Sequence, residues 1–191
     1  MKKFEKSYPG ILILVVGNSG SGKDSIIKGV VEKFPRNKMT IRLAQRYITR
    51  PPSEFEGNIS ISPNEFKEME EKNLFALNWH IYGLNYGVPI KIDKWLENGD
   101  IVLVNVSRTI VEETRKIYKN IKVVFIEVPF EISLKRLKER GRENKQQLNM
   151  RIERARKNKS FPAADYVIDN SKDLEYAIKQ FLEYIKTITK D

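Results

Sequence analysis

A glycine-rich segment directly after an apolar run restricts the fold of this chain more than any other feature. Residues 17–23 read Gly-Asn-Ser-Gly-Ser-Gly-Lys and follow the apolar run at residues 11–16. A strand, a glycine loop that ends in lysine, and a helix form, in this order, the phosphate-binding loop of nucleotide kinases and NTPases. The glycines let backbone N–H groups surround a phosphate, and Lys23 reaches the β and γ oxygens. The alternative, a glycine turn that merely joins two elements, does not require this order.

The residue after the lysine departs from the usual pattern. Phosphate loops place Ser or Thr there as a Mg²⁺ ligand, whereas this chain has Asp24 followed by Ser25. The Asp24 carboxylate either helps to hold Mg²⁺ or only complements the positive end of the helix dipole. We expect the metal-linked role for Asp24, with Ser25 beside it. The expected ATP-binding residues are Gly17, Asn18, Ser19, Gly20, Ser21, Gly22, Lys23, Asp24 and Ser25.

Length and composition are those of one globular domain with a proper core. The chain has 191 residues, of which 40% are hydrophobic and 31% charged. It has no cysteine, which excludes disulfides and thiolate metal sites and permits the reducing cytoplasm that we expect as its location. No apolar run is long enough to span a membrane, and residues 1–9 lack the apolar part of a signal peptide.

The net charge of +10 fits several kinds of partner. Nucleic acid is one, and small substrates that carry several phosphates are another. A solvated lysine-rich surface accounts for part of any such excess. Charge alone does not choose among them.

Alternating strands and helices predict an α/β fold of the P-loop NTPase type, with a parallel sheet flanked by helices. The nearly continuous apolar character of the strand-like runs suits strands covered on both faces. Strands are expected at residues 11–16, 101–106, 123–128 and 166–168, and helices at residues 25–34, 110–118, 131–140 and 174–188.

Residues from 41 to about 95 interrupt this alternation and predict an inserted substrate lobe with antiparallel character. They include the pair Pro51 and Pro52, alternating residues 59–62, a short acidic helix near residues 64–72 and an aromatic-rich stretch at residues 75–86. The chain is therefore expected to form one domain over residues 1–191. Its core covers about 8–40 and 96–191, and a lid covers about 136–156.

Arginines gather in the segment predicted as a lid. They lie on two helical arms around the polar, glycine-led residues 141–147. Such a helix–loop–helix closes over a triphosphate, excludes water and neutralises the oxygens of the transferred group. A solvated basic helix is the alternative. The arginines are Arg136, Arg140, Arg142, Arg151 and Arg154.

A second basic cluster opens the lobe. Arg46 and Arg50 flank an apolar stretch just before Pro51 and are placed to clamp a second phosphate. Tyr86, next to Gly87, offers a hydroxyl donor where a missing side chain allows close approach. His80, the only histidine, either contacts substrate or makes a structural hydrogen bond, and alone it is no metal site.

The order of these motifs resembles the guanylate kinase superfamily, and within it the ribose 1,5-bisphosphate phosphokinases of phosphonate breakdown. In this subgroup aspartate typically follows the loop lysine, as Asp24 does. The chain departs from the subgroup at residues 55–58 and at Val106. Guanylate kinases have a second arginine after a Thr-Arg-x-Pro motif, and this chain lacks it. At residues 103–108 the chain reads Leu-Val-Asn-Val-Ser-Arg, where guanylate kinases have an acidic strand end. The resemblance rests on residues 19–25, 46–50, 76–80, 83–87, 103–108 and 140–144.

The resemblance implies phosphoryl transfer from ATP, with Mg²⁺, to ribose 1,5-bisphosphate, giving 5-phosphoribosyl 1-diphosphate (PRPP) and ADP. Catalysis is assigned to Lys23, Arg136, Arg140, Arg142 and Arg151, and acceptor binding to Arg46, Arg50, His80, Tyr86 and Asn105. Small molecules are then the partners, without nucleic acid or membrane, and the oligomeric state stays open, a homodimer included. The alternatives are a guanylate kinase, which converts ATP and GMP to ADP and GDP, a non-catalytic module of the same fold, and a basic nucleic-acid-binding domain.

Overall fold

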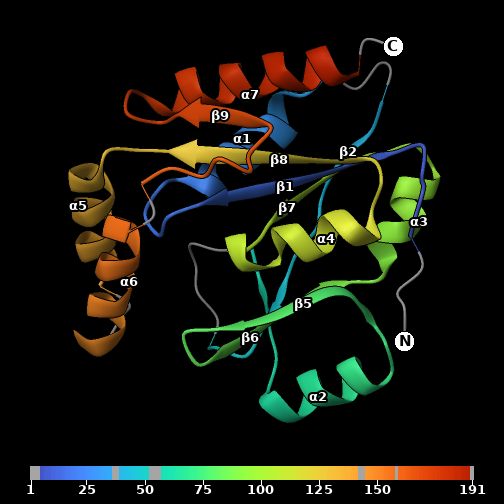
Figure 1. Cartoon of the computed structure of the whole chain (residues 1–191), viewed down its shortest axis with the longest axis horizontal. Coiled ribbons are helices and arrows are strands. Elements are labelled where there is room, and N and C mark those ends of the chain that lie inside the picture. The colour runs from blue at the N-terminus through green and yellow to red at the C-terminus, as the bar shows by residue number, and fades with distance from the viewer. Residues whose placement is uncertain (1–4, 36–38, 52–56, 142–144, 158, 190–191) are drawn as a thin grey trace. The chain divides into compact units, whose positions relative to one another are not determined.

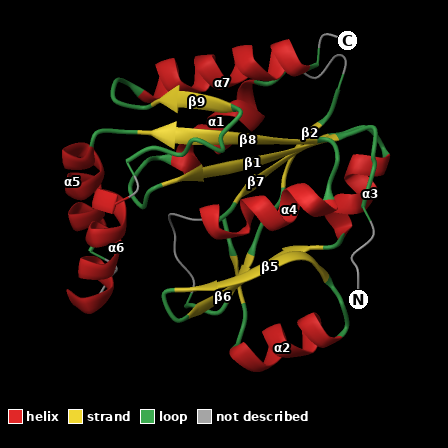
Figure 2. Cartoon of the chain, viewed as in Figure 1, coloured by secondary structure: helices red, strands yellow, loops and turns green. Residues whose placement is uncertain are grey.

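The computed structural model describes residues 5–35, 39–51, 57–141, 145–157 and 159–189. Its main sheet has five strands in the order β2-β7-β1-β8-β9, and a second sheet has four in the order β4-β3-β6-β5 (Figures 1 and 2). The pairs β2–β7 and β8–β9 are parallel, which confirms the predicted α/β class. The main-sheet strands are β1 (Ile11–Gly17), β2 (Ile41–Leu43), β7 (Ile101–Asn105), β8 (Ile121–Glu127) and β9 (Tyr166–Asp169).

Two compact units make up the chain. The first comprises Met1–Leu14 and Pro35–Lys122, and the second comprises Val15–Phe34 and Val123–Asp191. The phosphate loop and the expected lid both belong to the second unit, and the expected acceptor residues belong to the first.

The first unit contains the four-stranded sheet of the lobe. Strands β3 (Tyr47–Ile48) and β5 (Phe75–Ile81) pair antiparallel with β6 (Leu84–Pro89), and β4 (Ile59–Ser60) pairs parallel with β3. Tyr82 and Gly83 both have positive φ, as a two-residue type I′ hairpin turn requires. The antiparallel character expected from the sequence is therefore present in the β3–β6 and β5–β6 pairs.

Helix α2 (Pro63–Glu71) is the short acidic helix of the lobe, and Figure 1 shows it beside the β5–β6 hairpin. It begins with a capping box, in which the Glu65 N–H donates to the Ser62 hydroxyl and the Ser62 N–H donates to the Glu65 carboxylate. Phe66 on its buried side stacks on Phe75 of β5 at 4.7 Å between ring centroids. This stack fixes the helix against the sheet.

Two elements of the first unit are not predicted by the sequence. Residues 41–43 form β2, which joins the main sheet by pairing with β7, whereas the sequence predicts that they open the lobe. Residues 91–97 form helix α3 (Lys91–Glu97), where no helix was expected. Strand β2 has only three residues, none of them buried, which are too few to show the hydrophobic periodicity of a strand.

The helix α4 (Val111–Ile117) agrees with the helix expected at residues 110–118, and it follows a 3₁₀ turn at Arg108–Ile110.

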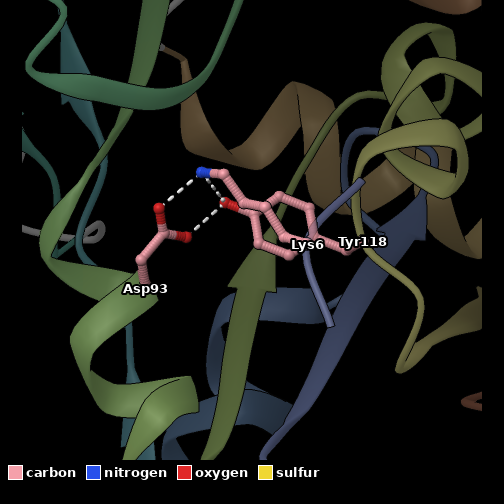
Figure 3. Close-up of polar contacts among 3 residues, drawn as sticks. All are labelled: Lys6, Asp93 and Tyr118. Carbon is pink, nitrogen blue, oxygen red and sulfur yellow. Dashed lines mark hydrogen bonds and ion pairs between the residues drawn. The ribbon is translucent and has the colours of Figure 1, made fainter. Parts of the chain in front are cut away.

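A polar network ties the N-terminal segment of the first unit to α3 and to the end of α4. The Tyr118 hydroxyl donates to Asp93 at 2.6 Å, and the Lys6 ammonium pairs with the same carboxylate (Figure 3). The backbone N–H of Lys6 also donates to the Ile117 carbonyl at 2.6 Å. Burial, the hydrogen bond to Asp93 and its negative charge all raise the pKa of Tyr118.

The second unit packs α1 (Lys23–Lys33) against the C-terminal helix α7 (Leu174–Ile188). Gly29 permits this approach, because a Cβ there would lie 2.2 Å from Cδ1 of Ile178. Helices α5 (Phe130–Arg140) and α6 (Lys145–Lys157) form the two arms expected for the lid, and Figure 1 shows them side by side. Within the ranges described, no helix is long and apolar enough to cross a membrane.

Candidate functional site

The phosphate loop has the predicted order of strand, glycine loop and helix. Strand β1 ends at Gly17 and α1 begins at Lys23. Gly20 and Gly22 have φ of 80° and 84°, left-handed values that other residues rarely adopt. A Cβ at Gly20 would also lie 2.5 Å from the Ser133 carbonyl oxygen of α5. Glycine is therefore required here both for the backbone turn and for the close approach of α5.

The ammonium group of Lys23 folds back onto the loop. Its Nζ donates to the Gly17 and Asn18 carbonyl oxygens at 2.9 and 2.8 Å and lies 3.3 Å from the Ser21 hydroxyl. These oxygens hold the positive charge at the loop. A phosphate placed there gains both this cation and the positive end of the α1 dipole.

Asp24 and Ser25 lie in the first turn of α1, the former partly buried and the latter exposed. Both directly follow the loop lysine, as the motif expects of residues near the metal of a bound nucleotide. Among the described residues, no group of three or more His, Asp or Glu side chains is placed to hold a metal by itself. A Mg²⁺ ion here would therefore need ligands besides the side chains of the protein.

Both lid helices contact the phosphate loop directly. The Arg151 guanidinium of α6 donates to the Ser19 hydroxyl at 3.1 Å, and the Asn18 side chain reaches the Ala155 carbonyl at 3.5 Å. On α5, Nη1 of Arg136 lies 3.7 Å from where a Cβ of Gly22 would be. Two arginines that are expected from the sequence to take part in catalysis thus lie at the loop.

For the other arginines of the predicted lid, the structure describes fewer contacts. Arg140 ends α5, but its side chain lies outside the described part of the structure, as does the whole of Arg142. Arg154 lies partly buried on α6. The contacts of the lid with the loop are therefore known through Arg136 and Arg151.

Asn170 is a loop contact that the motifs did not assign. In the structure its side chain is 2% exposed and donates to the Ser21 carbonyl at 2.7 Å. An asparagine directly after a strand of the parallel sheet is the only signal that the sequence offers for this contact.

On the acceptor side, Arg46 and Tyr86 belong to one cluster of the lobe. Nε of Arg46 donates to the Asn58 side-chain oxygen at 3.1 Å, and its guanidinium carbon lies 5.9 Å from the centroid of the Tyr86 ring. Tyr86 in turn stacks on Trp79 with 5.2 Å between centroids and 3° between planes. The packed aromatic pair fixes the position of the arginine, which leaves fewer rotamers to order when an anion binds.

Arg50 lines a shallow cavity of about 350 Å³ in the same lobe, which is widely open to solvent. Its own carbonyl accepts a hydrogen bond from the Ser60 hydroxyl, which joins the segment before Pro51 to β4. The wall combines the guanidinium-bearing residue with hydroxyl groups and the first turn of α2. The lining residues are Thr49, Arg50, Pro51, Ser60, Ile61, Ser62, Pro63 and Glu65.

His80 and Tyr86 lie on opposite faces of the hairpin. Tyr86 is paired across the strands with Trp79, and His80 is paired with Asn85. Because these pairs are successive, their side chains point to opposite faces of the sheet. The exposed imidazole has its Nδ1 2.8 Å from the Asn85 side-chain oxygen. Asn105, the remaining acceptor candidate, ends β7 and is 7% exposed. The structure thus groups Arg46 with Tyr86 and places His80 on the other side of the sheet.

Comparisons with known proteins find similar sequences over nearly the whole chain. The guanylate kinase family model matches residues 10–188. A protein of Pectobacterium parmentieri named ribose 1,5-bisphosphate phosphokinase PhnN is 36% identical over 174 residues, which cover 89% of this chain and 90% of that protein. One of the same name from Enterobacter lignolyticus is 37% identical over 180 residues, with 93% of each covered.

A solved structure supports the fold independently of sequence. The crystal structure of guanylate kinase from Anaplasma phagocytophilum superposes with a TM-score of 0.68 at 16% identity. The match covers 97% of this chain and 89% of the other. At this identity the likeness concerns the fold alone.

Proposed function

This chain belongs to the guanylate kinase family, and we propose that it transfers the γ-phosphate of ATP to ribose 1,5-bisphosphate, giving PRPP and ADP. The observation that carries the phosphoryl-transfer chemistry is the contact of Arg151 with Ser19. It joins an arginine-bearing helix to the phosphate loop, and these are the two parts that stabilise a transferring phosphoryl group.

The choice of acceptor is supported by the relatives. The two described above carry the name ribose 1,5-bisphosphate phosphokinase, and the alignments cover nearly the whole of each protein. Asp24 in place of the usual Ser or Thr agrees with the resemblance to that subgroup. GMP is the competing acceptor, because the family model is that of guanylate kinase.

In the proposed reaction, an oxygen of the acceptor's 1-phosphate attacks the γ-phosphorus of ATP. The bond from the γ-phosphorus to the β–γ bridging oxygen breaks, and ADP leaves. A phosphate nucleophile is already anionic at neutral pH, so no side chain has to remove a proton. Catalysis then depends on positioning and on neutralising charge.

The loop and the lid supply these two effects. When a triphosphate enters, its oxygens replace the Gly17 and Asn18 carbonyls as partners of Lys23, which then bridges the β and γ phosphates. Arg136 and Arg151 neutralise the transferring group from α5 and α6. We propose the same role for Arg140 and Arg142, because they belong to the arginine-rich segment that the sequence predicts as a lid.

The lobe binds the acceptor in this proposal. Arg46, held by Asn58 and stacked over Tyr86, takes one phosphate, and Arg50 takes the other at the wall of the cavity. Bidentate binding by planar guanidinium groups suits doubly charged phosphates. Asn105 and His80 are proposed as further acceptor contacts, although His80 does not share a face with Tyr86.

Asp24 and Ser25 would hold a Mg²⁺ ion, which would supply positive charge against the phosphates of ATP. The Asp24 carboxylate at the start of α1 fits a metal that the nucleotide itself brings, directly or through water, with Ser25 next to it. Two polyanionic substrates also give the net charge of +10 a use that requires no nucleic acid. A cytoplasmic location, where ATP is abundant, belongs to the same proposal.

A coupled assay of ADP release tests the proposal. The purified protein with Mg²⁺ and ATP is given ribose 1,5-bisphosphate in one reaction and GMP in another. The proposal expects rapid ADP release with the bisphosphate and little with GMP. The reverse preference would identify a guanylate kinase, and no release with either would favour a non-catalytic module.

A further inference from the structure

We propose that Asn170 is a positioning residue for nucleotide phosphates, because its side chain sets the orientation of the peptide group that joins Ser21 to Gly22. This inference rests on the proposed nucleotide-binding role of the loop. It adds to that role a residue that lies 149 positions from Ser21 in the chain and outside every motif described above.

The contact itself is buried and short. Asn170 follows β9 directly, and its side-chain Nδ2 donates to the Ser21 carbonyl oxygen at 2.7 Å. Its backbone N–H donates to the Glu127 carbonyl of β8 at 2.9 Å, which continues the β8–β9 pairing by one residue. Both the backbone and the side chain of Asn170 are therefore fixed.

Peptide geometry converts this contact into an effect on phosphate binding. In a trans peptide the carbonyl and the N–H point in opposite directions. When Asn170 draws the Ser21 carbonyl toward itself, the N–H of Gly22 must point the other way. Gly22 is the N-cap of α1, where backbone N–H groups have no partner within the helix and are available to an anion.

The loop leaves little other freedom to this peptide group. The Ser21 N–H donates to the Asn18 carbonyl at 3.1 Å, and Ser21 as a whole is 0% exposed. A Cβ on Gly22 would lie 2.5 Å from Nδ2 of Asn170. The glycine is thus needed for the approach of the asparagine as well as for its positive φ.

A second set of contacts holds the backbone next to Asn170. On α7, the Gln180 side chain donates to the Asp169 carbonyl at 2.9 Å and accepts from the Asp169 N–H at 3.2 Å. The Asp169 carboxylate accepts from the N–H of Ser171 at 2.8 Å. The residues on either side of Asn170 are therefore held, so its amide is preorganised before nucleotide arrives.

The experiment replaces Asn170 and measures nucleotide binding without acceptor. For N170A we expect the Kd of Mg-ADP, measured by calorimetry, to rise by about 10-fold or more, as when one well-aligned hydrogen bond to a charged group is lost. The Kd of adenosine, measured by NMR titration, should be the same for N170A and wild type, because adenosine lacks phosphates. The kcat should fall by a similar factor while the KM of the acceptor stays unchanged.

Asn120→Ala is the matched control. The Asn120 side chain also donates to a backbone carbonyl, that of Gly10 at 2.9 Å, but it belongs to the first unit, whereas the loop belongs to the second. This variant should lower the Tm while leaving the Kd of ADP unchanged. A change in ADP binding that occurs in N170A alone separates positioning from general stability.

Three results would overturn the inference. The first is wild-type ADP affinity in N170A, and the second is an equal loss of ADP and adenosine, which would indicate a contact with the base. If the variant does not fold, hydrogen exchange is measured on the wild-type protein instead. The Asn170 side-chain amide protons should exchange slowly because they are buried and hydrogen-bonded. Rapid exchange of these protons is the third result that would overturn the inference. Failure of the wild type to bind ADP would instead reject the proposed function, and this inference with it.

Discussion

The guanidinium of Arg151 and the hydroxyl of Ser19 lie 3.1 Å apart, joined by a hydrogen bond that links α6 to the phosphate loop. The two residues are 132 positions apart in the sequence. The contact places a permanent positive charge beside the loop before any nucleotide is bound. It brings the α6 arm of the proposed lid onto the loop within the second unit.

Replacing Arg151 should therefore impair catalysis more than folding. We expect R151K to lower kcat by at least about 10-fold and R151A by about 100-fold or more, since lysine keeps the charge but loses the planar fork. Steady-state kinetics with Mg-ATP and the acceptor measures this. The control is R156K on the same helix, where Arg156 is exposed and pairs with Glu153. Equal losses in the two variants would argue against a specific role for Arg151.

Lys23→Ala should abolish turnover in a folded protein. The ammonium group interacts with three loop oxygens and is the charge expected to bridge the β and γ phosphates. Its loss should reduce kcat by about 1000-fold, comparable to the removal of other charges at a phosphoryl-transfer centre. Lys28→Ala on the exposed side of α1 serves as the control. Near wild-type activity in K23A, with circular dichroism unchanged, would contradict the assignment.

Arg50→Ala should separate acceptor binding from ATP binding. Arg50 lines the cavity of the lobe, in the unit that does not contain the phosphate loop. The loss of a charge-assisted contact to phosphate should raise the KM of the acceptor by about 10- to 100-fold and leave the Kd of ATP near its wild-type value. Lys67→Ala, on the exposed surface of α2, should change neither quantity. Equal effects on both substrates would show that Arg50 does not act as an acceptor clamp.

The network of Tyr118, Asp93 and Lys6 predicts a loss of stability at alkaline pH. Because burial raises the pKa of Tyr118 in the folded protein, the unfolded chain releases this proton first as the pH rises. The free energy of unfolding should therefore be unaffected by this group below about pH 10 and fall above it, by up to about 1.4 kcal/mol per pH unit. Urea unfolding between pH 8 and 11 measures the slope.

Tyr118→Phe removes both the ionisable group and its hydrogen bond to Asp93. It should cost about 1–2 kcal/mol at neutral pH and flatten the alkaline decline. Tyr176, a residue that is 41% exposed, gives the control Y176F, which should keep the wild-type slope. A decline that is just as steep in Y118F would mean that other groups, such as Tyr8, determine it.

The parts of the fold that local sequence determines were predicted well. The glycine loop requires a strand before it and a helix after it, and α7 has the predicted bounds because one apolar face repeats along its whole length. The start of α1 lies at Lys23, two residues earlier than expected, since Gly22 and not a polar side chain caps it. Strand β2 was missed because its place in the main sheet depends on β7, far along the chain.

The candidate site was predictable where a motif names the residues and not where contacts are long-range. Lys23, Arg136 and Arg151 follow from charge and spacing. That His80 and Tyr86 lie on opposite faces depends on the register of the hairpin, which residue types alone do not reveal. The contact of Asn170 with Ser21 joins two segments that only the folded sheet brings together.

Phosphorus NMR of the reaction products tests the central claim most directly. Wild-type protein with Mg-ATP and ribose 1,5-bisphosphate should convert the signal of the 1-phosphate into the coupled pair of a 1-diphosphate, while ATP becomes ADP. In a parallel sample with GMP, the spectrum should stay unchanged over the same time. Formation of GDP, with the bisphosphate left intact, would contradict the account.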